Sequence, residues 1–368
     1  MDETGTSPYS SILNTRICKL CGIQYPIIQT GMGWVSDANL TAATSSAGGL
    51  GIIASATMSY QELCSQVHRV KELTDKPFGV NMRADQEDII KRIDLLISEG
   101  VKVASFAQAP KRNLIDKLKS AGLVTIPTIG ARRHAEKVAG WGVDAVIAQG
   151  HEGGGHTGPV PTSILLPEVC DAVDIPVLGA GGFRDGRGLI AALSYGAEGI
   201  AMGTRFLLTQ ESPVPNHIKK RYLKTQTNGT VVTKSIDGYP QRVIRTTLID
   251  NLEKSSWMTR VIRSIYYALT FQRETQSSFF SLLKEGLQLK QAQGLTWGQM
   301  LMAANAPMLT KASLVNGAEE VGILPTGQIV GLIEELPSAT EVVAQIMREA
   351  TQTLMRLQLQ PKGPTDAP

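Results

Sequence analysis

Residues 150–158, GHEGGGHTG, place two histidines around a run of three glycines. The helical metalloprotease motif separates its two histidines by four residues on one helix face. His151 and His156 are five residues apart, and the intervening glycines oppose a helix. Because no third ligand lies nearby, we predict no metal here, although a metal site in a folded loop stays open.

The three glycines suggest a different use for the same segment. Gly154 and Gly155 can adopt positive φ and bring the backbone close to a flat ring, with His156 beside it. Imidazole exchanges protons near neutral pH, which suits a catalytic acid or base acting on a substrate above that ring. A structural histidine that caps the next segment is the alternative interpretation.

A second glycine cluster, GAGGFR at 179–184, begins like the dinucleotide fingerprint, but Arg184 occupies the place of its third glycine. Backbone without Cβ atoms can still approach a phosphate closely. Parallel barrels typically bind phosphate on the loops after strands seven and eight. The residues that match this placement are Gly181, Gly182, Gly203 and Thr204. We therefore expect FMN or a phosphorylated substrate there, with plain tight turns as the alternative.

The elements that would position these residues alternate regularly from residue 25 to about 205. The candidate strands are Tyr25–Gln29, Leu50–Ala54, Phe78–Asn81, Val101–Phe106, Val124–Thr128, Ala145–Gln149, Pro176–Gly179 and Gly199–Met202. The helical stretches between them include Ser59–Leu73, Asp85–Ser98, Lys111–Ser120, Arg132–Gly140 and Gly186–Tyr195. Eight such units predict an α/β fold, a TIM (β/α)8 barrel, with a doubly wound open sheet as the alternative.

The unusual residues fall where these strands end. They occupy the stretches 29–33, 81–83, 149–156, 179–182 and 203–205. A barrel brings the carboxyl ends of all its strands to one face. We therefore expect these loops to form a single site.

The chain is expected to divide into a barrel with a closing helix, a mainly helical C-terminal insertion or lid, and a disordered tail. In this order the parts span 20–212 with 316–358, then 213–315, then 359–368. A capping box of Ser338 and Glu341 predicts the start of the closing helix. Within the insertion we expect helices over Leu252–Ala268 and Phe279–Lys290.

The composition is that of a globular protein, with 368 residues, 42% hydrophobic, 19% charged and a net charge of +3. It offers no nucleic-acid footprint and no apolar run of ~18 residues, and we expect no signal peptide. We expect a cytoplasmic protein that binds neither nucleic acid nor membrane, and a homo-oligomer stays open. Cys18 and Cys21 form a C-x-x-C without the second pair that zinc requires, so we interpret the spacing as coincidental.

Six ordered motifs resemble the nitronate monooxygenase (2-nitropropane dioxygenase-like) family of FMN-dependent barrels, which includes flavin-dependent enoyl-acyl-carrier-protein reductases. The motifs are QTGMG (29–33), AGGLGIIA (47–54), KPFGVN (76–81), QGHEGGGHTG (149–158), GAGGFRDGRG (179–188) and AMGTRF (201–206). The resemblance spans roughly residues 20–210, with a further GQIVG at 327–331. One departure is Gly153, where members commonly carry alanine.

The resemblance implies a TIM barrel that holds FMN without a covalent bond. By motif position, the residues at the flavin ring would be Gln29, Gly31 and Met32 beneath it, with Asn81 and Gln149 at its edge. The four residues named above for phosphate would hold the phosphate of FMN. His156 matches the catalytic histidine of the family, whereas His151 sits at a variable position.

The main functional expectation is oxidation of alkyl nitronates, with FMN as cofactor and O2 as acceptor. His156 would orient the nitro oxygens or take the α-proton of a nitroalkane. Arg83 is a candidate for stabilising negative charge on the flavin, or else an ordinary loop arginine.

An alternative is an NAD(P)H- or NAD-dependent flavin reductase or dehydrogenase that acts on a CoA thioester, steroid-ring-derived or enoyl. Segments 229–232, 295–297 and 302–305 resemble a branch linked to steroid-ring breakdown, thought to act on bulky CoA thioesters. The basic run 219–221 is a solvated helix face or a contact for CoA phosphates. A barrel that binds a phosphate ligand without catalysis is a third hypothesis.

Overall fold

The computed structural model describes residues 10–254 and 297–358, which divide into two units by their internal contacts. The first unit holds the described residues up to His151, Pro159–Ser212 and those from Leu336 onward. The second holds Glu152–Gly158 and the described part of Pro213–Glu335, so this division places 316–335 with the second unit. Most of the expected helix Leu252–Ala268, all of Phe279–Lys290 and the tail 359–368 lie outside the described residues.

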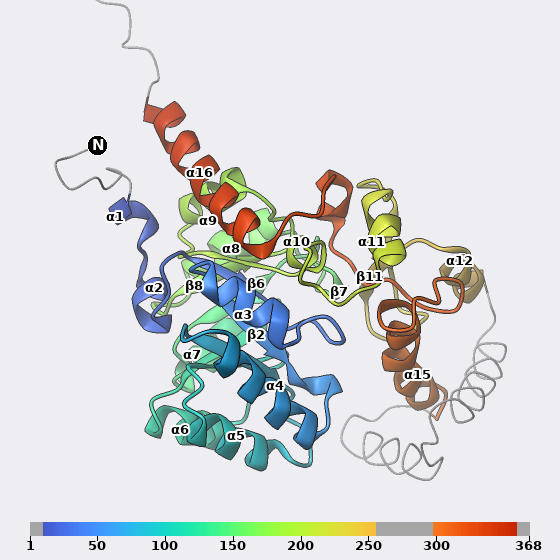
Figure 1. The fold of residues 1–368 in the computed structure, drawn as a ribbon, viewed down its shortest axis with the longest axis horizontal. Helices are drawn as coiled ribbons and strands as arrows, with labels where there is room; N and C mark the ends of the chain where they lie inside the picture. The colour runs from blue at the N-terminus through green and yellow to red at the C-terminus, as the bar shows by residue number, and fades with distance from the viewer. Residues whose placement is uncertain (1–9, 255–296, 359–368) are drawn as a thin grey trace, which may run out of the picture. The chain divides into compact units, whose positions relative to one another are not determined.

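Eight parallel strands close into a barrel in the first unit (Figure 1). In order around the barrel they are β1 (Ile27–Gln29), β2 (Leu50–Ala54), β3 (Phe78–Met82), β4 (Val103–Phe106), β5 (Val124–Ile129), β6 (Val146–Gln149), β8 (Val177–Ala180) and β9 (Ile200–Met202). The ring closes between the last and first strands, where Ala201 lies opposite Ile28. The predicted TIM (β/α)8 fold is confirmed.

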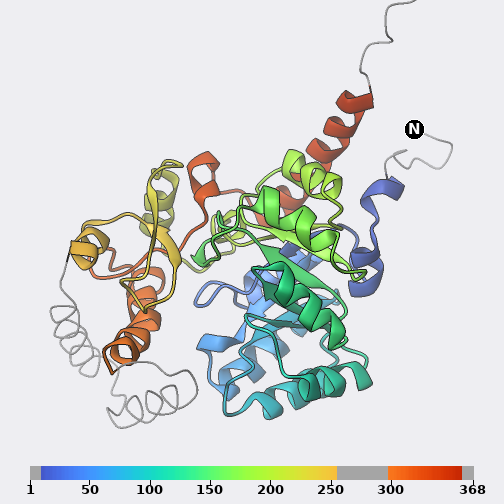
Figure 2. The same ribbon diagram turned by 180° about the vertical axis from the view of Figure 1, so that it is seen from behind.

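Helices cover the outside of these strands (Figures 1 and 2). They are α3 (Ala38–Ser46), α4 (Tyr60–Leu73), α5 (Ile89–Ser98), α6 (Arg112–Ser120), α7 (Arg132–Gly140), α8 (Thr162–Cys170) and α9 (Gly186–Ser194). Short helical segments η1 (Ser55–Thr57) and α10 (Thr204–Leu207) follow β2 and β9, and α1 (Ser10–Leu13) and α2 (Arg16–Cys21) precede the barrel.

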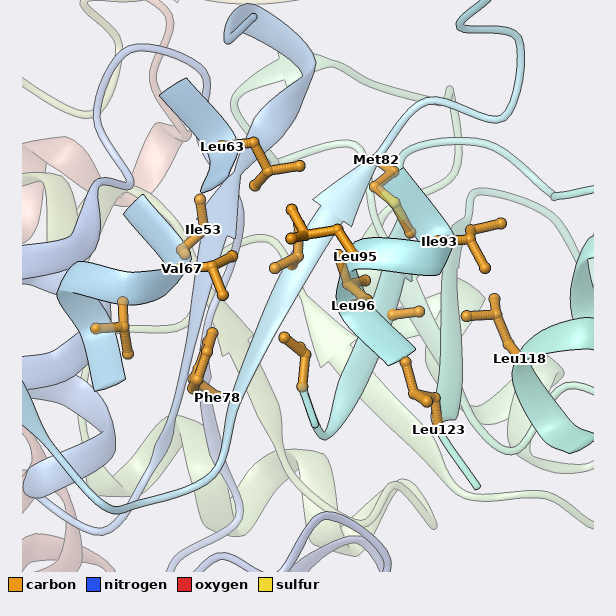
Figure 3. Close-up of a cluster of buried hydrophobic side chains, with 14 of the residues drawn as sticks. Ile53, Leu63, Val67, Phe78, Met82, Ile93, Leu95, Leu96, Leu118 and Leu123 are labelled. Atoms are coloured by element: carbon orange, nitrogen blue, oxygen red, sulfur yellow. The ribbon is translucent and has the colours of Figure 1, made fainter. Parts of the chain in front are cut away.

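One apolar cluster fills the space between the strands and their covering helices (Figure 3). Leu63 and Val67 of α4 and Ile93 of α5 are fully buried there, beside Ile53 and Met82 from the strands. The helical spacing of these apolar residues explains why the amphipathic stretches were predictable and why they pack on the barrel.

A second cluster joins α2 to the barrel strands. Ile17, Cys18 and Cys21 pack there with strand residues that include Ile28 and Ile126. Both cysteines are buried free thiols, and burial raises the pKa of Cys21 to about 12. Both pack in this apolar cluster, and the Cys18 thiol also contacts the Leu13 carbonyl and the Thr15 hydroxyl, which supports the interpretation of the C-x-x-C as coincidental spacing.

The closing helix α16 (Ala339–Gln358) begins as the capping box predicts. The Ser338 amide donates to the Glu341 carboxylate at 2.7 Å, and the Glu341 amide donates to Ser338 Oγ at 3.2 Å. The helix packs on α9, where the Gly186 amide donates to Glu349 at 3.0 Å. None of the helices in the described ranges is long and apolar enough to span a membrane.

The second unit contains a small sheet that sequence reasoning did not predict. Its antiparallel strands are β10 (Thr230–Thr233), β11 (Gln241–Ile244) and β7 (Gly155–His156), in that order. Its described helices are α11 (Asn216–Leu223), α12 (Thr247–Lys254), α15 (Trp297–Leu314) and η2 (Gln328–Leu332). Ile236, Val243 and Ile323 form part of its apolar core.

Candidate active site

Nine predicted cofactor residues lie in the first unit, at or just after the carboxyl ends of barrel strands. They are Gln29, Gly31 and Met32 after β1, Asn81 on β3, Gln149 on β6, Gly181 and Gly182 after β8, and Gly203 and Thr204 after β9. All the strands are parallel, so these positions share one rim of the barrel.

Gln29 supports the loop after β1 from inside the barrel wall. It is fully buried, and its side-chain amide donates to Ser36 Oγ at 2.8 Å and to the Ile52 carbonyl at 3.2 Å. Ser36 Oγ in turn accepts the Met32 amide at 2.9 Å. The side chain of Gln29 thus shapes the loop that carries Met32.

Asn81 lies where the loop after β1 meets β3. A Cβ on Gly31 would overlap the Asn81 side chain, so only glycine permits this approach. Asn81 Nδ2 donates to Ser105 Oγ at 3.2 Å, and Ser55 Oγ donates to the Asn81 carbonyl at 2.8 Å. These contacts hold the Asn81 amide at the rim with 8% of the residue exposed.

A buried arginine, which the sequence analysis did not single out, fixes the neighbouring loop. The Arg92 guanidinium on α5 is 3% exposed and bonds Asp88 at 2.8 Å. It also donates to the carbonyls of Ser55 at 2.9 Å and Met58 at 2.8 Å. Arg92 therefore anchors the loop after β2, which contains the Ser55 that contacts Asn81.

The loops after β8 and β9 present backbone that fits a phosphate group. Gly181 and Gly182 have φ of +94° and +83°, and Gly182 is exposed. The Thr162 hydroxyl donates to the Gly181 carbonyl at 3.0 Å, which ties this loop to α8. A Cβ on Gly203 would lie 3.3 Å from Met32 Sδ, so the loops after β9 and β1 adjoin.

The basic candidates have local partners. Arg83 bonds the Asp85 carboxylate with two nitrogens, at 3.0 and 2.7 Å. In the basic run of α11, Lys219 is buried and Arg221 pairs with Glu319 at 2.6 Å, while Lys220 is exposed. The helix α11 therefore does not present a cluster of exposed cations that could bind the phosphates of CoA.

The glycine run after β6 allows its backbone to pass close to the segment at residues 326–327 within the second unit. A Cβ on Gly154 would overlap the backbone of Thr326 and Gly327. Gly155 has φ of +67°, which confirms the predicted positive φ in this run. The crossing is reinforced by the Gln328 amide, which donates to the Glu152 carbonyl at 2.9 Å.

His156 lies on β7, opposite Gln241 of β11. Its Nε2 is 2.7 Å from Asp237 Oδ2, and the Tyr239 ring approaches edge-on at 6.2 Å between centroids. The His156 side chain is 64% exposed, whereas that of Asp237 is 7% exposed. The second unit thus contains an accessible imidazole beside a buried carboxylate.

Asp237 is a residue that the sequence analysis missed. Burial alone would raise the pKa of its carboxyl, but His156 and the Tyr239 amide together hold the pKa below its usual range. Asp-Gly at 237–238, between two β-branched runs, is a hairpin signal that could have placed it. Within the described ranges, no group of three or more His, Cys, Asp or Glu could hold a metal ion.

A closed (β/α)8 barrel with glycine-rich loops on its carboxyl rim defines the first unit as an enzyme scaffold of the TIM-barrel class. The chain belongs to the nitronate monooxygenase family, whose model matches residues 14–92 and 88–349. It is therefore an oxidoreductase of a typically flavin-dependent family.

Three known proteins are similar to this chain over most of its length. It is 56% identical over 340 residues to (3aS,4S,5R,7aS)-5-hydroxy-7a-methyl-1-oxo-octahydro-1H-indene-4-carboxyl-CoA dehydrogenase of Rhodococcus jostii, covering 92% of this chain and 96% of the relative. It is 33% identical to a probable nitronate monooxygenase of Staphylococcus saprophyticus, covering 66% and 81%. The structure of FabK from Thermotoga maritima matches with a TM-score of 0.76 and 32% identity, covering 94% and 98%.

Proposed function

We propose that this protein is an FMN-dependent dehydrogenase of a CoA thioester with a fused-ring acyl group. The observation that carries the proposal is the similarity to the Rhodococcus dehydrogenase, which is much higher than that to the nitronate monooxygenase and extends through both units. This similarity supports the alternative formed from the sequence better than the main expectation of nitronate oxidation.

The barrel rim fits FMN. The glycine loops after β8 and β9 would hold its phosphate, and the Asn81 amide and the loop carrying Met32 would contact its ring. Bound there, FMN supplies an acceptor for the two electrons that a dehydrogenation removes from the substrate. A nicotinamide cofactor is the proposed co-substrate that exchanges those electrons with the enzyme.

The protein side chain proposed for proton transfer is His156. A dehydrogenation also releases a proton, and a carbon next to a thioester carbonyl is acidic enough for a side-chain base to take it. The exposed imidazole on β7 can accept that proton and pass it to water. Its position on the loop between β6 and α8 follows from the chain order of a βα barrel.

An anaerobic flavin-reduction panel tests this proposal. The full-length protein is loaded with FMN and mixed separately with the CoA thioester of the Rhodococcus relative, with propionate-3-nitronate and with NADH. We expect the thioester or NADH to bleach the visible flavin band and the nitronate to leave it intact. NAD+ added to the thioester-reduced enzyme should restore the band.

Two results would contradict the proposal. Rapid bleaching of the flavin band by the nitronate, without bleaching by the thioester or NADH, would support nitronate oxidation, the main expectation from the sequence. Protein that stays colourless after incubation with FMN would favour a barrel that binds a phosphate ligand without catalysis.

A further inference from the structure

We infer that Asp237 is the positioning residue of His156 and fixes the neutral imidazole with its proton on Nε2, so that Nδ1 is the nitrogen that accepts the substrate proton. The inference rests on the proposed acid–base role of His156 and deepens it by naming the reacting atom. It depends on the contact between Nε2 and Asp237 Oδ2, at 2.7 Å.

The carboxylate is held rigidly before it meets the histidine. Its other oxygen, Oδ1, accepts the Tyr239 amide at 3.0 Å, and Gly238, with φ of +90°, bonds its amide to the Lys234 carbonyl at 3.0 Å. These bonds fix the turn between β10 and β11. Both carboxylate oxygens therefore have defined directions within the second unit.

The imidazole is fixed from the other side by the sheet. β7 pairs with β11, so that His156 lies opposite Gln241 and Gly155 lies opposite Arg242. The Thr157 amide donates to the Pro240 carbonyl at 3.1 Å, which continues this pairing beyond β7. The backbone of both partners is thus held by one short sheet and its turn.

The charge state of Asp237 determines which nitrogen of His156 carries the proton. An ionised carboxylate can only accept hydrogen bonds, so Nε2 of the neutral ring must be the donor. The remaining lone pair is on Nδ1. When Nδ1 takes a proton, the buried carboxylate stabilises the resulting imidazolium, which is the role that a triad carboxylate performs for its histidine.

The chain offers a matched control pair on the barrel. His68 Nε2 lies 3.2 Å from Glu99 Oε1, with both side chains more exposed than Asp237, at 57% and 22%. Glu99 also bonds Lys71 at 2.8 Å. The two imidazoles are similarly exposed, but the Glu99 carboxylate is more exposed than that of Asp237 and is shared with Lys71, so it should control its imidazole less than Asp237 controls His156.

The test is NMR of the full-length protein labelled with 15N-histidine, at alkaline pH where imidazoles are neutral. The five histidines of the chain are assigned by single substitutions. We expect His156 to show the Nε2–H tautomer in the native protein. Asp237→Asn, which keeps the Tyr239 contact but presents an amide, should shift this tautomer, and Glu99→Gln should leave it unchanged.

The same variants are compared in flavin reduction by the CoA thioester. Asp237→Asn should slow the reduction at least ~10-fold with little change in KM, because the carboxylate acts on proton transfer rather than on substrate binding. Asp237→Glu should recover part of the rate. Circular dichroism melting checks that each variant is folded.

The NMR readout separates the two proposals. An Nδ1–H tautomer in the native protein, or an unchanged tautomer and rate in Asp237→Asn, would overturn the role of Asp237. Native protein with the Nε2–H tautomer that the thioester fails to reduce would support the role of Asp237 and contradict only the proposed function.

Discussion

His156 and Asp237 are 81 residues apart in the chain and form one chemical unit. The imidazole supplies an exposed group that can exchange protons, and the carboxylate supplies a buried charge that water does not screen well. Neither residue type is unusual by itself. Their asymmetry in exposure is what distinguishes the pair from a surface ion pair of small energetic value.

Removing the imidazole of His156 should affect the rate of flavin reduction without affecting the binding of FMN. His156→Ala is expected to keep FMN, since nine of the twelve predicted site residues lie in the first unit and His156 does not. The rate of flavin reduction should fall by about 10²–10⁴-fold, the usual contribution of a general acid or base. Stopped-flow absorbance measures the rate, and His151→Ala is the matched control, expected to reduce normally.

Residue type and local spacing were sufficient to single out His156 as a candidate, because glycines around a titratable side chain leave few structural uses for it. They could not predict Asp237, because its partner is set by the pairing of β7 with β11. Arg92 was missed for a different reason, since an arginine on an amphipathic helix is expected to face water, whereas Arg92 is buried. Tertiary contacts made both residues functional candidates.

At the scale of elements, the loop after β2 depends on α5. Arg92 is the link, because its guanidinium satisfies two loop carbonyls as well as Asp88. This loop carries Ser55, whose hydroxyl bonds the carbonyl of Asn81. A helix on the outside of the barrel therefore supports an amide on its rim.

Arg92→Met should destabilise the protein by about 2–4 kcal/mol, because it leaves buried carbonyls and Asp88 without their donor. Arg69→Met on α4 is the control, since the Arg69–Glu72 pair is exposed, at 53% and 63%, and is worth ~0–1 kcal/mol. Urea unfolding followed by circular dichroism measures both. Equal effects of the two substitutions would contradict the anchoring role of Arg92.

The barrel strands were predictable because buried parallel strands are continuous apolar runs between turn residues. A helical stretch was expected after each strand, but the ranges of α3 and α8 were not predicted, and the reason differs between the two helices. The sequence of α3 is rich in small residues that are buried on several sides, and α8 contains Pro167. The strands β10 and β11 have four residues each, too few to show a clear alternation.

For the whole molecule, cofactor binding and folding are linked. A ligand that binds only the folded protein stabilises it according to its concentration relative to its Kd. The proposed phosphate contacts are backbone groups at Gly181, Gly182, Gly203 and Thr204. They belong to loops that adjoin α8 through Thr162 and the β1 loop through Met32. Occupying them should therefore stabilise the barrel as a whole.

FMN and riboflavin should differ in this effect, because riboflavin has the same ring but no phosphate. FMN at 100 times its Kd is expected to add ~2.7 kcal/mol to the free energy of unfolding, and riboflavin at the same concentration clearly less. Thermal unfolding of the cofactor-free protein, with each ligand added in turn, measures the difference. Equal shifts in Tm for the two ligands would show that the glycine loops after β8 and β9 do not bind the phosphate, and a rise with inorganic phosphate alone would show that they bind it without the ring.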